Sequence, residues 1–211
     1  MIIKQRRHSI TDEPYLENTM TKKKYRRVVG GIGWPSSLSP GFVLMLGEDL
    51  YAGDKFKIRD LHLITESESQ TPAELLSEMS MLQGVYTKVD WYGDTENPGM
   101  VFLSKKNKEL LIKHEPRVSI RRPPKQDVCG SFGLYAQLIK KRIGQEKTLY
   151  FDNCKKIANS VLGVVDIDKF KEGDSPGFAA LMYAVAAIEM KDVMPQTEEK
   201  KNRIGDRVGG Y

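Results

Sequence analysis

The chain has 211 residues, of which 40% are hydrophobic and 29% charged, and its formal net charge is +5. These values are typical of one sizeable soluble domain, with or without tails. No apolar run has the length of a membrane span, and the N-terminus lacks a signal-peptide core. Two cysteines, Cys129 and Cys154, give neither a disulfide framework nor a CxxC metal pattern, so we expect an intracellular protein with reduced thiols.

The first half of the chain predicts a polar arm followed by a sheet. Residues 1–24 are charged and lack a sustained period, so we predict an N-terminal arm. Buried strands are then expected over residues 25–34, 41–46 and 56–66. Because their connections are short, these three strands are predicted to form an antiparallel meander.

The clearest boundary in the sequence starts a helix over residues 71–83. Thr71 stands at the cap, Pro72 at the first helical position and Glu74 three residues after the cap. Gly84 is predicted to end the helix. The apolar side chains that share one face, toward the sheet, are Leu75, Leu76, Met79 and Leu82.

A fourth strand is expected over residues 88–94, between two helices. A strand flanked by helices belongs to a layered α/β sheet, and ligands gather at the carboxyl ends of such strands. Asp94 closes this strand and is therefore the first candidate for chemistry. The alternative is a turn-forming aspartate after Gly93.

The second half of the chain continues the alternation of helices and strands. Helices are predicted over residues 97–111, 131–143, 153–162 and 176–190, and strands over 117–121 and 148–151. The last helix has Ser175 at its cap, and its small residues form a stripe that lets a helix lie close on a sheet: Gly177, Ala180, Ala184 and Ala187. Residues 191–211 are charged and rich in glycine, and we predict a C-terminal tail.

Several segments carry a family resemblance. They are Tyr25-Arg26-Arg27-Val28-Val29-Gly30-Gly31-Ile32-Gly33-Trp34, Tyr92-Gly93-Asp94, Thr148-Leu149-Tyr150-Phe151 with the helix after it, and Gly173-Asp174-Ser175-Pro176 with its alanine-rich helix. In this order they resemble the ribonuclease-H-like fold of metal-dependent nucleases, and most closely the nuclease domain of phage terminase large subunits. The resemblance covers residues 25–190. It implies an α/β domain whose mixed sheet joins the antiparallel meander to parallel strands, with helices on both faces.

The resemblance also implies a chemistry. In that family, acids bind two divalent ions, Mg²⁺ or Mn²⁺, that hydrolyse a phosphodiester bond. By motif position, Asp94 and Asp174 match two of these acids. The third belongs on the first strand, in Gly-Ile-Asp-Trp, where this chain has Gly33. Glu66 closes the third strand at the correct rim, but two strand spacings of about 4.8 Å separate it from the first strand.

Partners follow from the same resemblance. DNA is expected, with Lys105, Arg122, Lys125 and Arg142 on its phosphates. The chain has no phosphate-binding loop of the Walker type, so the ATPase motor of a full terminase is absent from it. The resemblance leaves open a separate packaging ATPase or other phage proteins as partners, in the cytoplasm of a host that carries the phage or prophage. Two alternatives stay open: a non-catalytic DNA-binding or assembly module that keeps the fold, and a related hydrolase or resolvase with other ligand positions.

Other patterns predict structure rather than chemistry. Residues 30–33 look like a dinucleotide loop but lie inside a predicted strand with no helix directly after it. His62 alternates with core positions and is predicted to be packed rather than catalytic. Trp34 and Trp91 are expected to anchor the strands, although aromatic rings beside a nuclease site can also stack on a base.

Overall fold

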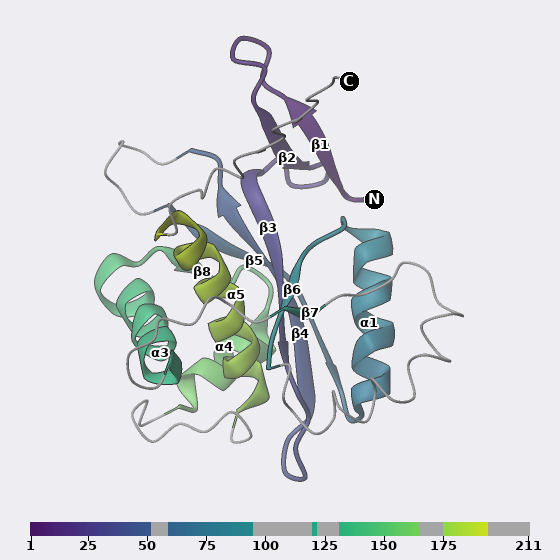
Figure 1. Ribbon diagram of the computed structural model, residues 1–211, viewed down its shortest axis with the longest axis vertical. Coiled ribbons are helices and arrows are strands. Elements are labelled where there is room, and N and C mark those ends of the chain that lie inside the picture. Colours follow the sequence, from purple (N-terminus) through teal and green to yellow (C-terminus); the bar gives the residue numbers. More distant parts are fainter. Residues whose placement is uncertain (52–58, 95–119, 122–130, 165–174, 194–211) are drawn as a thin grey trace, which may run out of the picture.

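The computed structural model describes residues 1–51, 59–94, 120–121, 131–164 and 175–193 (Figure 1). The predicted helix over 97–111, the predicted tail beyond residue 193, and Asp174, Lys105, Arg122 and Lys125 lie outside the described residues. Among the described helices, none is long and apolar enough to cross a membrane.

The centre of the molecule is a mixed sheet in the order β5-β4-β3-β6-β7. The meander is antiparallel and consists of β3 (Lys24–Gly33), β4 (Gly41–Asp49) and β5 (Leu61–Ser69). On the other side of β3, β6 (Trp91–Tyr92) runs parallel to it, and β7 (Ile120–Arg121) runs parallel to β6. This is the ribonuclease-H-like arrangement that the sequence predicts.

Helices cover both faces of the sheet (Figure 1). One face packs against α3 (Ser131–Lys141), α4 (Lys155–Leu162) and α5 (Pro176–Val193), and the other against α1 (Pro72–Val85). The alternation along β3 divides its side chains between two cores: Val29 lies with α5, whereas Val28 and Ile32 lie with α1. Trp34 and Trp91 anchor the strands on the α1 side, but they are fully buried rather than partly buried as the sequence predicts.

The N-terminal segment forms strands that the sequence did not predict. A hairpin of β1 (Ile3–Arg7) and β2 (Pro14–Asn18) joins the sheet where Leu16 pairs with Tyr25. Ile3 is buried, and its N–H donates to Tyr86 O at the end of α1. The hairpin is largely polar because much of it faces solvent, so its few apolar residues gave no sustained strand period.

Other boundaries moved by a few residues. The third strand of the meander is Leu61–Ser69 rather than 56–66, and β8 (Leu149–Tyr150) adds a parallel partner at its outer edge. The helix predicted over 131–143 ends at Lys141 and continues as a π-helical turn, η1 (Arg142–Glu146). That turn closes at Lys147, whose φ of 52° is left-handed.

The predicted capping box at the start of α1 is present. Thr71 Oγ1 accepts from Glu74 N, and Glu74 Oε2 accepts from Thr71 N, each at 3.3 Å. We expect Thr71→Ala to lower the free energy of unfolding by about 1 kcal/mol, because the backbone N–H of Glu74 loses its side-chain acceptor. Urea denaturation followed by circular dichroism measures this change. Thr71→Ser is the control and should retain most of the stability, since its hydroxyl can still accept from Glu74 N.

Candidate functional site

Two segments meet at the carboxyl end of β3. Gly33 is the last residue of this strand, and a Cβ built on it would lie 1.9 Å from Pro176 O in the first turn of α5. Next to it, Trp34 Nε1 donates to Asp94 O at 2.8 Å. The start of α5 and the chain just after β6 therefore both contact the end of β3.

This position is the topological switch point of the sheet. From β3 the chain places β4 and β5 on one side, and β6 and β7 on the other. We refer to the ends of β3 and β6 and the first turn of α5 as the crevice, because α/β proteins bind ligands at the carboxyl ends of strands at such a point. Asp94 is half-buried and lies two residues after β6 ends, whereas the sequence predicts a longer strand, over residues 88–94, that Asp94 closes. Asp174 lies two positions before the first residue of α5.

The place of the missing acid is filled by backbone. Gly31 and Gly33 point toward α5, and a Cβ on Gly31 would lie 2.0 Å from Ala180 O. Atoms at these distances overlap, so α5 lies on β3 only because neither position carries a side chain. The predicted stripe of small residues on α5 is on this side, since Ala184 Cβ would be 3.0 Å from a Cβ on Gly31.

Glu66 caps a helix instead of joining Asp94. It lies on β5, and its carboxylate accepts from Lys156 N at 2.9 Å and from Ile157 N at 2.8 Å. An acid that satisfies two N–H groups at a helix start also complements the helix dipole. Cys154, at the cap of the same helix, is a free buried thiol; burial, with Glu66 nearby, raises its pKa to about 12.

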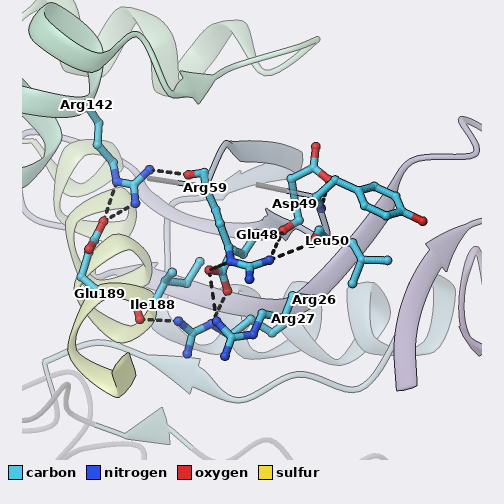
Figure 2. A network of polar contacts seen from close by, with 10 residues as sticks. Arg26, Arg27, Glu48, Asp49, Leu50, Arg59, Arg142, Ile188 and Glu189 are labelled. Carbon is cyan, nitrogen blue, oxygen red and sulfur yellow. Dashed lines mark hydrogen bonds and ion pairs between the residues drawn. The ribbon is translucent and has the colours of Figure 1, made fainter. Parts of the chain in front are cut away.

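Arg142, predicted to contact phosphate, is buried with 4% of its surface exposed. Its guanidinium forms an ion pair with Glu189 on α5 and donates to Arg59 O at 2.8 Å (Figure 2). It also donates to Thr148 Oγ1 at 3.2 Å. The basic run before it suggested a solvated surface, but the π-helical turn directs this side chain inward. We therefore leave Arg142 out of any DNA interface.

The same figure shows a buried ionic network that the sequence did not predict (Figure 2). Glu48, 3% exposed at the end of β4, forms an ion pair with Arg27 Nε at 2.7 Å and lies 3.7 Å from Arg59 Nε. Arg27 also donates to Ile188 O of α5. Arg27 and Glu48 are directly paired residues of β3 and β4, and this pairing could have predicted their ion pair. However, the pairing depends on a bulge in β3 that no sequence pattern indicates. The network lies at the opposite end of β3 from Gly33.

His62 is packed, as predicted, rather than placed in a crevice. Its ring stacks on Tyr150 with centroids 4.8 Å apart. Nδ1 accepts from Lys23 Nζ at 3.0 Å, because an ammonium can only donate, and Asp152 Oδ2 lies 3.5 Å away. Nε2 lies 3.9 Å from Asp49 Oδ2. These contacts join the turn before β3 to the chain after β8.

This environment predicts a pH dependence of stability. Burial, and then the Lys23 ammonium, lower the pKa of His62 below its ordinary value of 6.5, although Asp152, Asp49 and Asp60 oppose the shift. The unfolded chain therefore binds a proton more readily, so stability is complete above pH 6.5 and falls as the pH drops toward the folded-state pKa. We expect melting temperatures measured between pH 7.5 and 5 to decline less in His62→Gln than in the parent. His8→Gln, in the hairpin turn, should keep the parent's decline.

The carboxylate of Asp94 suits a hard cation, but one carboxylate is too few to hold a pair of ions. Oxygen ligands of the Asp94 type bind Mg²⁺ or Mn²⁺, and a pair of such ions requires carboxylates that converge from several strands. Gly33 contributes none, and its side-chain space is closed by Pro176. Within the described ranges, no three His, Cys, Asp or Glu side chains are grouped so that they could hold a metal ion.

The strand order defines the class of this protein: an α/β domain of the ribonuclease-H-like fold. Among solved structures, the nuclease domain of the large terminase from the bacteriophage SPP1, crystallised with bound Mn, is similar to it. The two chains are 14% identical, with a TM-score of 0.49 over 88% of this chain and 94% of that one. No protein-family model and no curated protein matches the sequence.

Proposed function

We propose that this chain is a terminase-like domain that binds DNA at the crevice between β3, β6 and α5 but has a degenerate hydrolytic site. The observation that carries the proposal is the contact between Gly33 and Pro176 O, which occupies the space of a first-strand acid. Two-metal hydrolysis depends on carboxylates from several strands, and the central strand supplies none here. Cleavage is therefore absent or very slow.

Asp94 and Asp174 are the acids that remain for a metal ion. Two carboxylates suit one Mg²⁺ or Mn²⁺ ion better than a pair of ions. When bound, such an ion supplies positive charge for a phosphate group and a more acidic water molecule. Asp94, held beside Trp34 through its backbone carbonyl, would orient that ion at the strand end.

DNA binding would rest on basic residues that follow β6 and β7 along the chain. We propose Lys105, Arg122 and Lys125 as phosphate contacts, which carry no base specificity. A separate packaging ATPase and other phage proteins are the proposed partners, and the host cell the setting.

The test measures binding and cleavage together. Fluorescence anisotropy with a labelled duplex, at 50 to 200 mM salt, should show affinity that falls steeply with salt. Replacing Lys105, Arg122 and Lys125 together by alanine should reduce the salt slope by about 0.9 for each phosphate that the variant no longer neutralises. Lys140→Ala, in the exposed basic run of α3, is the matched control and should leave the slope unchanged. Supercoiled DNA incubated with Mn²⁺ should stay intact, and a chain that binds no duplex would contradict the proposal.

A working nuclease is the second candidate, because Asp94 does lie at the switch point. It would replace the first if Mn²⁺-dependent cleavage were found and were abolished in Asp94→Asn. Asp90→Asn is the matched control, since Asp90 lies just before β6 rather than after it. Cleavage that survives in Asp94→Asn but disappears in Asp90→Asn would instead place the metal ligands elsewhere.

A further inference from the structure

The hairpin and the start of β3 expose a second surface, far from the crevice. Directly paired residues of adjacent strands share a face, and here Lys4 pairs with Glu17, Arg6 with Tyr15, and Glu17 with Lys24. These five side chains therefore lie on one face of a three-stranded sheet. With Tyr51 we call this surface the hairpin face. The hairpin extends beyond the helices at the top of Figure 1.

Two tyrosines flank a lysine on this face. Lys24 Nζ lies 5.2 Å from the centre of the Tyr15 ring and 6.0 Å from that of Tyr51. Two hydrogen bonds hold the backbone at Tyr51 in place: Leu50 N donates to Lys24 O at 3.0 Å, and Tyr51 N donates to Asp49 Oδ1 at 3.2 Å. Tyr51 nevertheless remains 60% exposed. A held but exposed aromatic residue has an open surface for another flat ring.

The charge of the hairpin face is positive. It carries three cations, Lys4, Arg6 and Lys24, and one carboxylate, that of Glu17, which lies 3.4 Å from Arg6 Nε. Lys4 and Arg6 are exposed, on a strand at the edge of the sheet. Cations that alternate with aromatic rings on an open sheet surface suit a polyanion whose flat rings are accessible.

We propose that the hairpin face binds single-stranded nucleic acid, with Tyr51 and Tyr15 stacking on bases and Lys4, Arg6 and Lys24 on phosphates. A single strand suits these residues better than a duplex, since paired bases do not present their faces to a tyrosine. An acidic peptide would use the basic residues of the hairpin face but would leave its two tyrosine rings without a role. The surface is separate from the crevice, because Lys24 and Gly33 are the two ends of β3, about 30 Å apart at 3.3 Å per residue.

The experiment uses the full chain and a fluorescein-labelled oligothymidine of about 15 nucleotides, titrated by anisotropy at several salt concentrations. Tyr51→Ala should weaken binding about tenfold, as expected for one stacked base. Lys24→Gln should lower the slope of log affinity against log salt by about 0.7, for one phosphate contact to a single strand. Tyr150→Ala is the matched control, because Tyr150 is 41% exposed but lies on β8, off the hairpin face. Circular dichroism confirms that each variant is folded.

Other results would overturn the proposal. Wild-type affinity in Tyr51→Ala would exclude stacking, and equal affinity for a duplex of the same sequence, unchanged in Tyr51→Ala, would assign the surface to duplex DNA. Displacement of the oligonucleotide by polyglutamate at equal charge concentration, with no effect of Tyr51→Ala, would assign it to an acidic protein. The combined Lys105, Arg122 and Lys125 variant separates the two proposals: it should lose duplex binding at the crevice and keep oligothymidine binding at the hairpin face.

Discussion

Replacing Gly33 by aspartate is expected to destabilise the domain and not to restore a metal site. The new Cβ would lie 1.9 Å from Pro176 O and 2.7 Å from Pro176 C. Both are backbone atoms, so no side-chain rotation relieves the overlap, and α5 must move away from β3. Overpacking of this kind costs about 1–3 kcal/mol, and placing a carboxylate against a buried backbone carbonyl costs more. Urea denaturation should therefore show a loss of about 3 kcal/mol or more.

Two glycine-to-alanine variants separate overlap from charge. Gly31→Ala, with its Cβ 2.0 Å from Ala180 O, should be destabilised although it adds no charge. Gly84→Ala is the matched control, because a Cβ there meets nothing within 4 Å near the end of α1, so its stability should be unchanged or slightly higher. A Gly33→Asp protein that melts like the parent and cleaves DNA in Mn²⁺ would contradict this expectation. It would show that α5 can move away from β3 at little cost, and that one substitution separates this chain from an active nuclease.

Gly33 is informative only in three dimensions. The motif shows that an acid is missing, but not that a helix has taken its space. That information is divided between Gly33 and Pro176, which are distant in the chain and adjacent in the fold. By contrast, the capping box at Thr71 was predictable, because all its atoms lie within one turn of helix.

Two other differences have the same origin. The meander and α1 were predictable because these elements are long enough to show their own period or cap, whereas β6 and β7 have two residues each and were placed by the order of the motifs. The hairpin was not predictable, since its pairing depends on Ile3 reaching the end of α1 and on Leu16 meeting β3. Arg142 appeared as part of a basic surface, but its partner Glu189 is on another helix. The role of a polar residue depends on its partners, and a sequence does not display partners.

The position of α5 follows from contacts at both of its ends. Pro176 in its first turn lies on Gly33 and Ala180 in the next turn lies on Gly31. Near its end, Ile188 O accepts from Arg27 and Glu189 pairs with Arg142. Glu48 holds the Arg27 guanidinium in place for that contact (Figure 2). The helix that fills the acid position is thus also fastened to the opposite end of the sheet.

Removing the carboxylate of Glu48 should therefore have the second large effect. Glu48→Ala leaves the Arg27 guanidinium without the acid 2.7 Å from it, at a position where the glutamate side chain is 4% exposed. Deleting one member of a buried ion pair costs about 3–5 kcal/mol, because the remaining charge stays out of water. Urea denaturation measures the loss. We expect the transition of Glu48→Ala to move to a clearly lower urea concentration than that of the parent.

A matched pair on the surface tests whether burial is the cause. Arg7 and Asp12 are also 2.7 Å apart, but their side chains are 65% and 77% exposed, so Arg7→Ala should change stability very little. A double-mutant cycle of Glu48→Gln with Arg27→Met then isolates the coupling between the buried partners. Coupling near zero, or equal losses in Glu48→Ala and Arg7→Ala, would mean that the buried charges do not fasten α5 and that its position depends on the glycine contacts alone.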